Sequence, residues 1–299
     1  MDIPRPDRPL LTYGLYPLVV GGAATAAALV VRAGVDRPAA LPAILVSTIA
    51  VCMLVEWRHP LQRRWRMTAR TLGRRDLPYI GAGLVTERAS EVAVAAITRR
   101  TVATGGFGPL ARLPLALQVV VAIAVFDLLW YAYHRAAHAT PRLWRVHGAH
   151  HAPAQLYVLM HGVFHPFDEL VVRFALALVV FRFSGVAPGA VTIALAVVGA
   201  IGIISHINAD VRLWGVNHLL VGPETHRLHH GADRRANYGT ATTIWDQLFG
   251  TFEFSFEPPD ALGLADPAGY PNPEHFHRVL LWPLRRSHPR PAGERGAVT

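Results

Sequence analysis

The chain has 299 residues, of which 52% are hydrophobic and only 16% are charged, and its formal net charge is +9. This composition excludes an ordinary soluble domain and makes an integral membrane protein the expected class. The charge comes wholly from arginines that flank apolar runs instead of alternating with exposed aromatic residues, so the sequence indicates no nucleic-acid partner.

Two apolar runs open the chain, and Leu10–Val31 and Ala40–Val55 are both predicted to span a membrane. The first run is longer than the apolar core of a secretory signal peptide, which favours a retained helix. The segment Trp57–Asp76 follows with seven arginines, and the positive-inside rule places it in the cytoplasm. The single cysteine, Cys52, cannot form an internal disulfide, which fits a reducing compartment.

The next run, Leu77–Ile97, is the weakest predicted span because Glu87, Arg88 and Glu91 interrupt it. Charges at that depth are costly unless they face protein or water, so this segment is either a helix packed inside the bundle or a re-entrant piece. The run Leu113–Tyr133 is strongly apolar and ends in aromatic residues of the kind found at membrane interfaces.

The runs Leu170–Phe183 and Ala187–Ser205 are predicted to form a helical hairpin, and no later run is long enough to cross a membrane. If Leu77–Ile97 spans, counting from the arginine-rich loop places His134 and His226 together on the cytoplasmic side. The predicted fold is therefore an all-α integral membrane helical bundle with a cytoplasmic cap that carries the histidines.

Histidines are concentrated in two short windows, 127–165 and 206–230, which hold 12 of the 16 in the chain. His134 and His138 are four residues apart and share one face of a helix, as two rings that bind one metal require. The pattern HxxHH occurs at His147–His151 and again at His226–His230. In a helix, such a motif directs two rings to one ion and turns the third, by about 100° per residue, toward a neighbouring ion.

These three motifs supply more imidazoles than one tetrahedral zinc site can use, and their number suits two metals. No HExxH motif is present, which argues against a zincin protease, and one cysteine is too few for a zinc finger. Imidazole suits iron, zinc and copper alike, so the ligands alone do not identify the metal.

On these motifs the chain resembles the fatty acid hydroxylase and sterol desaturase superfamily of integral-membrane di-iron oxygenases. The resemblance covers about Asp127–Phe252 and includes DLLWYAYHRAAH, LWRVHGAHH, the histidine of ISHIN, and THRLHHGADRRANYGTATTIWDQLFGTF. The arginine-rich segment Glu56–Asp76 also looks like the run that precedes the catalytic part. These motifs are specific for the superfamily and do not identify a substrate.

The resemblance implies a di-iron centre, with zinc as an alternative occupant. Its implied ligands are His134, His138, His147, His150, His151, His206, His226, His229 and His230. Asp127 and Asp246 are candidates to accept a hydrogen bond from a ligand ring, although Asp127 could equally pair with Arg135. His161 and His165 form a further HxxxH pair that either supports the ligands, faces the substrate or packs helices.

The implied function is an O2-dependent hydroxylase or desaturase that acts on an unactivated C–H position of a lipid, such as a fatty acyl chain, a sterol or another terpenoid. Hydroxylation is preferred over desaturation. A separate ferredoxin, flavoprotein or cytochrome is expected to supply electrons. The alternatives are a histidine-lined membrane metal transporter or sensor, whose ligands should lie near mid-membrane, and a purely structural membrane protein.

The chain is predicted to divide into three parts. Residues 1–112 form an N-terminal transmembrane region with the arginine-rich cytoplasmic loop, and residues 113–256 form the catalytic histidine region with the transmembrane hairpin. Residues 257–299 form a segment rich in proline and arginine that is expected to be partly disordered. Within the second part, Asn237–Phe252 is expected either to pack as an amphipathic element or to close the site.

Overall fold

The computed structural model describes residues 6–34, 39–101, 109–171, 185–232 and 234–285. Within these residues the chain is helical, with two isolated bridges, Leu220 to Thr242 and Gly231 to Leu262, in place of strands. The predicted all-α class is confirmed. The helices are α1 (Pro9–Arg32), α2 (Ala40–Arg58), α3 (Ala69–Thr71), α4 (Leu77–Thr101), α5 (Leu115–Ala139), α6 (Pro141–His151), α7 (Pro166–Leu170), α8 (Pro188–Ser205), α9 (Pro223–His229), α10 (Ile244–Leu248) and α11 (Phe276–Leu280).

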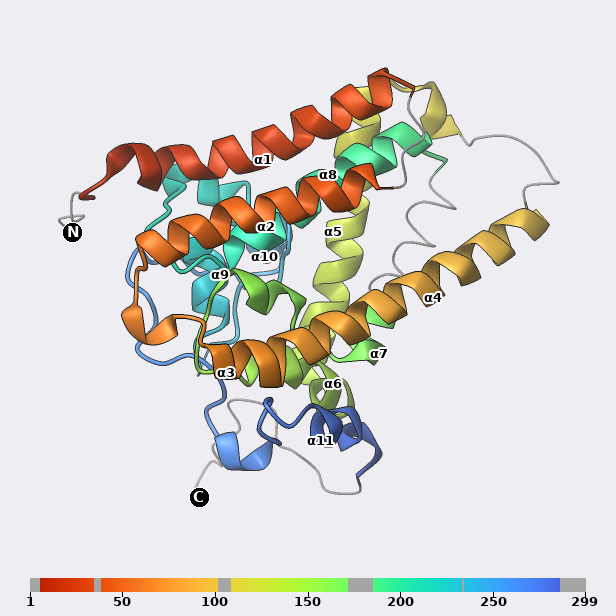
Figure 1. Ribbon diagram of the computed structural model, residues 1–299. Coiled ribbons are helices and arrows are strands. Elements are labelled where there is room, and N and C mark those ends of the chain that lie inside the picture. The colour runs from red at the N-terminus through yellow and green to blue at the C-terminus, as the bar shows by residue number, and fades with distance from the viewer. Residues whose placement is uncertain (1–5, 35–38, 102–108, 172–184, 233, 286–299) are drawn as a thin grey trace.

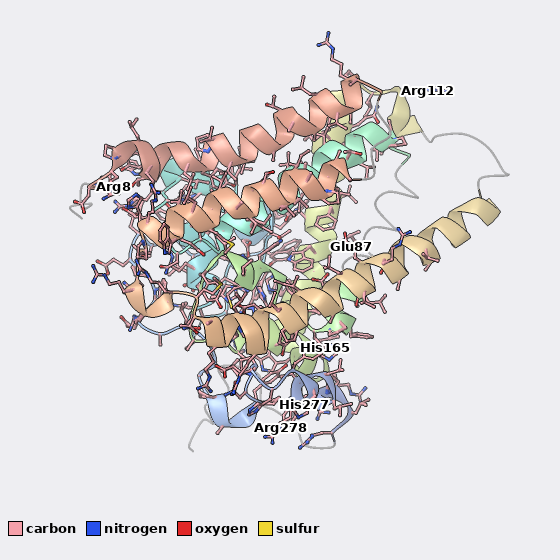
Figure 2. All side chains as sticks on the ribbon, in the orientation of Figure 1. Arg8, Glu87, Arg112, His165, His277 and Arg278 are labelled. Atoms are coloured by element: carbon pink, nitrogen blue, oxygen red, sulfur yellow. The ribbon has the colours of Figure 1, made fainter. Side chains whose placement is uncertain are left out.

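Four of the described helices, α1, α2, α5 and α8, are long and apolar enough to cross a membrane. The chain is therefore a multi-pass membrane protein. In Figure 1 the start of α1 and the ends of α2 and α8 lie at one end of the bundle, while α5 begins at the opposite end. Arg8 and Arg112 mark these two ends in Figure 2.

Close packing of small residues joins α8 to α1 and α2. Ala23, Ala196 and Ala200 are buried between these helices. A Cβ atom added at Gly199 would lie 2.8 Å from Leu45 Cδ2, so the glycine allows α2 to approach α8 closely. Small residues at helix contacts are the usual means of association between membrane helices, because burial of apolar surface provides little drive inside lipid.

The segment predicted as the weakest span forms one continuous helix, α4, of 25 residues. It is not a re-entrant piece, and it is not among the four candidate spans. It packs against α7 and runs along one side of the bundle (Figure 1). Leu84 and Val85 are 61% and 71% exposed, so α4 lies at the edge of the bundle with apolar side chains uncovered.

The predicted hairpin is seen in its second half only. α8 matches the predicted run Ala187–Ser205, while α7 ends at Leu170 and most of the run Leu170–Phe183 lies outside the described residues. Part of the C-terminal segment is packed rather than loose, since Tyr270 and Val279 are buried beside Tyr79. Residues 286–299 lie outside the described residues, and the three-part division of the chain stays a prediction.

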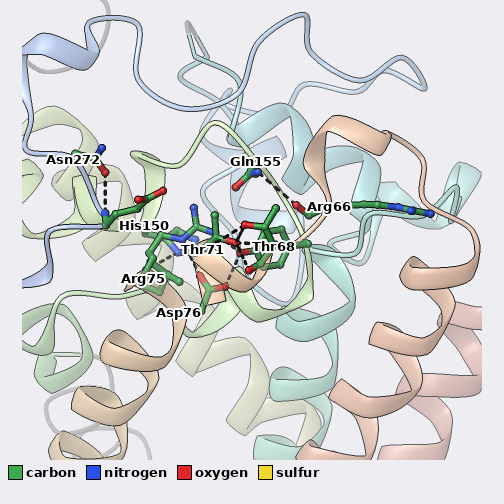
Figure 3. A network of polar contacts seen from close by, with 11 residues as sticks. Arg66, Thr68, Thr71, Arg75, Asp76, His150, Gln155 and Asn272 are labelled. Carbon is green, nitrogen blue, oxygen red and sulfur yellow. Dashed lines mark hydrogen bonds and ion pairs between the residues drawn. The ribbon is translucent and has the colours of Figure 1, made fainter. Parts of the chain in front are cut away.

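The arginine-rich loop and the histidine-bearing segments lie at the same end of the bundle, which we call the cap side. The backbone N–H of Leu61 donates to the Asn208 carbonyl at 3.0 Å, two residues after His206. Arg75, at the start of α4, contacts the Tyr157 hydroxyl and donates to Asp76 at 2.8 Å (Figure 3). The arginines therefore lie on the side that carries the histidines.

Candidate metal centre

The first two histidines lie near the C-terminal end of α5. His134 and His138 are both buried at its cap-side end, and their ring centroids are 5.0 Å apart. One turn before His134, Trp130 packs against its ring with centroids 5.6 Å apart. The apolar part of α5 thus leads directly to a pair of imidazoles on one face.

The two HxxHH motifs lie on α6 and at the end of α9. In α6, His147 and His151 face the rings of α5, while His150 points toward His206. Near α9 the middle histidine of the motif, His229, faces the rings of α5, whereas His226 and His230 lie together on the other side. Each motif therefore contributes two rings to one side and one to the other, as expected from the rotation between adjacent helical residues.

The nine histidines of the predicted ligand set form two buried groups. The five-histidine group consists of His134, His138, His147, His151 and His229, and the four-histidine group consists of His150, His206, His226 and His230. Within each group one nitrogen per ring lies within 4.8 Å of the corresponding nitrogens of the others. The His151 and His230 rings, one from each group, have centroids 4.5 Å apart, so the two groups are adjacent.

The Nε2 atoms point inward and crowd together. His151 Nε2 lies 3.2 Å from Nε2 of both His138 and His229. In the other group, His226 Nε2 lies 3.0 Å from His206 Nε2 and 3.2 Å from His230 Nε2. The Nε2 atoms of His134 and His147 are buried without a hydrogen-bond partner.

The outward Nδ1 atoms are held by the protein, which fixes the rings. His134 donates from Nδ1 to the Tyr238 carbonyl at 2.8 Å, and His229 donates to the Ala236 carbonyl at 2.8 Å. His150 and His206 donate to the carbonyls of Val163 and Gly202 at 3.2 and 2.7 Å. A proton on Nδ1 leaves Nε2 with a free lone pair, which is the form that ligates a metal.

Burial keeps these rings neutral. It lowers the pKa of His229 to about 3. Burial, reinforced by neighbouring histidines, lowers the pKa values of His150, His151, His206, His226 and His230 well below the ordinary value. Neutral imidazoles with converging lone pairs and two orphaned nitrogens fit bound metal ions, because a cation between the nitrogens removes both the repulsion and the cost of unpaired buried polar atoms.

One carboxylate that the sequence did not indicate contacts a ring of the five-histidine group directly. Asp168, in α7, is buried and accepts from His147 Nδ1 at 2.8 Å. It also accepts from the Tyr133 hydroxyl. The available signal was an acidic pair, Asp168 and Glu169, directly before the predicted apolar run Leu170–Phe183.

The two predicted outer aspartates hold a loop instead of a ring. Asp127 accepts from the backbone N–H groups of residues 240, 241 and 242 at 2.9, 2.8 and 3.0 Å, and from the Thr242 hydroxyl. Asp246 accepts from the N–H of Tyr238 at 2.7 Å, and the carbonyl of Tyr238 holds His134. Both aspartates therefore hold the loop before α10, whose Tyr238 carbonyl accepts from His134. The loop packs against the five-histidine group, and its role in closing the site stays a prediction.

The second HxxxH pair does not join either group. His161 is half-buried, and its ring centroid lies 5.4 Å from that of His206. His165 caps α7 by accepting from the N–H of Phe167 and donates to the Leu280 carbonyl at 3.2 Å. His161 thus packs beside the four-histidine group, whereas His165 ties α7 to α11.

Comparison with known proteins agrees with this geometry. A fatty acid hydroxylase family model matches residues 119–251. Ornithine lipid hydroxylase OlsE of Rhizobium tropici is 32% identical over 221 residues, which cover 70% of this chain and 66% of that protein. Alkylglycerol monooxygenase of Homo sapiens is 27% identical over 165 residues, which cover 52% of this chain and 36% of that protein.

No solved structure gave a significant match. The family match spans every histidine of the two groups, from His134 to His230. The chain therefore belongs to the fatty acid hydroxylase and sterol desaturase superfamily.

Proposed function

We propose that this protein is a membrane-bound di-iron oxygenase that hydroxylates an unactivated C–H position of a lipid. The observation that carries the proposal is the convergence of nine buried histidines in two adjacent groups, beside the C-terminal ends of the apolar helices α5 and α8. The names of the two relatives, a lipid hydroxylase and an alkylglycerol monooxygenase, support the same reaction class.

The five-histidine and four-histidine groups would each hold one iron ion. Two ions there would supply the O2 activation that protein side chains cannot provide. In the overall reaction, a C–H bond, O2, two electrons and two protons give an alcohol and water. Desaturation would use the same oxidant and remove a second hydrogen instead. Hydroxylation is preferred because the names of the two relatives, a hydroxylase and a monooxygenase, denote oxygen insertion.

Aromatic side chains pack against the histidine rings beside the apolar part of α5. Trp130 lies one turn deeper in α5 than His134, and its ring centroid is 6.3 Å from that of Phe164. Phe164 stacks on His150 with centroids 4.1 Å apart and an interplanar angle of 9°. A lipid chain that reaches the histidines would meet this apolar wall, which excludes water and holds a C–H position without polar competition.

The cap side is proposed to face the cytoplasm. The support is the arginine-rich segment Trp57–Asp76, which lies at that end of the bundle. On that side a separate ferredoxin, flavoprotein or cytochrome would deliver the two electrons.

The test is expression in a host that supplies ornithine lipids or alkylglycerols, the two lipid kinds named by the relatives, under 18O2. The proposal expects a lipid that gains one 18O atom, and two iron ions per purified chain. The His150→Ala protein is the inactive control. Purified wild-type protein without iron, and lipids unchanged under O2, would contradict the proposal.

The alternative of a metal transporter is less favoured by the geometry. Discontinuous helices near mid-membrane are expected in a transporter, whereas the described histidines lie at helix ends and in the cap. Time-dependent metal uptake by vesicles that contain the protein would favour the transporter.

A further inference from the structure

The five-histidine group contains one ring that is held differently from the others. Among the outward hydrogen bonds described above, four end on neutral backbone carbonyls, and the bond from His147 ends on a carboxylate. We propose that Asp168 is a positioning residue that strengthens His147 as a metal ligand and makes the ion of the five-histidine group electronically distinct from its neighbour. This inference rests on the proposed function.

The contact is enclosed and well directed. The His147 and Asp168 side chains are both 0% exposed, and His147 Nδ1 lies 2.8 Å from Asp168 Oδ2. The Tyr133 hydroxyl donates to the other oxygen, Oδ1. Within the described part of the chain, the hydrogen bonds to this carboxylate thus come from one ligand ring and from the residue beside another ligand, His134.

A buried carboxylate pulls on the proton of the ring that donates to it. The opposite nitrogen, His147 Nε2, becomes a stronger electron donor to a metal ion, and it is buried without a hydrogen-bond partner. The low dielectric of the interior strengthens this effect compared with water. A backbone carbonyl carries no net charge, so His150 and His206 receive no comparable support in the other group.

The hydrogen bond from the Tyr133 hydroxyl determines how strongly the Asp168 carboxylate polarises the His147 ring. This hydrogen bond stabilises the charge on Asp168 and therefore weakens the pull on the ring. Removing the Tyr133 hydroxyl and neutralising the Asp168 carboxylate should consequently shift the reduction potential of the five-histidine ion in opposite directions. A role limited to holding α6 against α7 would predict no such opposition.

The main test is Asp168→Asn, which keeps the shape and removes the charge. With 57Fe-loaded protein and a competing chelator, we expect about 10–100-fold weaker binding of one ion, which is the usual cost of changing such an outer partner. The second ion should keep its wild-type affinity. Both ions retained at wild-type affinity, or both weakened in parallel, would overturn the inference.

The matched control is Asp76→Asn. Asp76 is also buried and also lies beside a tyrosine hydroxyl, Tyr157 at 2.6 Å, but its other partner is Arg75 and not a histidine (Figure 3). This variant should lose stability in unfolding experiments while both ions keep their affinities. Selective loss of one ion in Asp76→Asn would show that any buried charge near the cap has the effect, and the inference would fail.

A second variant keeps the inference testable if Asp168→Asn does not fold. In a His226→Ala background, which is designed to leave only the five-histidine ion, Tyr133→Phe should lower the reduction potential of that ion and alter its Mössbauer doublet. Asp168→Asn should raise the potential. An unchanged doublet in Tyr133→Phe would overturn the inference, whereas wild-type protein that binds no iron at all would overturn the proposed function instead.

Discussion

The five-histidine and four-histidine groups share α6 and α9 but depend on different supports. His134 and His229 of the first group are held by carbonyls of the loop 236–242, and His134 is 104 residues from its partner. In the second group, His206 is held by the Gly202 carbonyl of its own helix, four residues away. The comparison teaches that the His134 ring is held by a long-range contact, whereas the His206 ring is held within its own helix.

Removal of one ligand from each group gives the largest expected effect. His229→Ala and His226→Ala alter residues three positions apart that face different groups. Each variant should lose one ion and keep the other, and product formation should fall by more than about 100-fold, the upper end for loss of an outer-shell partner. Metal analysis and 18O incorporation measure both effects. Loss of both ions from either variant would break the comparison by showing one cooperative site.

Asp127→Ala should weaken the five-histidine group selectively. The change leaves three N–H groups of residues 240–242, one buried and two partly buried, without their acceptor and should lower the free energy of unfolding by about 3 kcal/mol. Chelator competition should show weaker binding in the five-histidine group only. Asp210→Ala is the control, because its pair with Arg212 is partly exposed and worth at most about 1 kcal/mol.

Gly202→Ala is the corresponding change beside the four-histidine group. A Cβ atom there would lie 2.5 Å from His161 Cε1, so the His161 ring must move. Overpacking of this kind costs about 1–3 kcal/mol. Unfolding and chelator titrations should report a loss confined to the four-histidine ion. Restored stability in the double variant with His161→Ala would identify the contact as the cause.

Acid should lower the folding stability of the metal-free protein, because histidines of both groups are protonated on unfolding. The pKa of His229 is about 3 when folded and about 6.5 when unfolded, so the unfolded chain binds more protons between these values. Stability is therefore unaffected above about pH 6.5 and falls below it, by about 1.4 kcal/mol per pH unit for each such histidine. Denaturant unfolding at a series of pH values measures the slope. A slope of opposite sign would contradict neutral buried rings.

His165→Ala should have the smallest effect and should leave both groups intact. It removes the cap of α7 and the contact with Leu280, at a cost of about 1 kcal/mol. Iron content and chelator affinity should equal those of the wild type. A missing ion would show that His165 supports the metals after all.

Sequence periodicity predicted much of the site. The spacing of His147, His150 and His151 requires a division of two rings and one on any helix, and the structure has this division in both HxxHH motifs. The spans α1, α2, α5 and α8 follow from apolar length. Asp168 could not be predicted as the partner of His147, because their contact depends on how α7 packs against α6.

By itself, then, the sequence determined which residues bear imidazoles and how each short motif directs them, because helical rotation is a local property. Only the tertiary structure decided which motifs meet and which outer group holds each ring. Asp127 illustrates the difference, since its partners lie 113 to 115 residues away and its carboxylate serves a loop instead of a histidine. Contacts over such separations depend on the packing of whole elements, which local spacing does not specify.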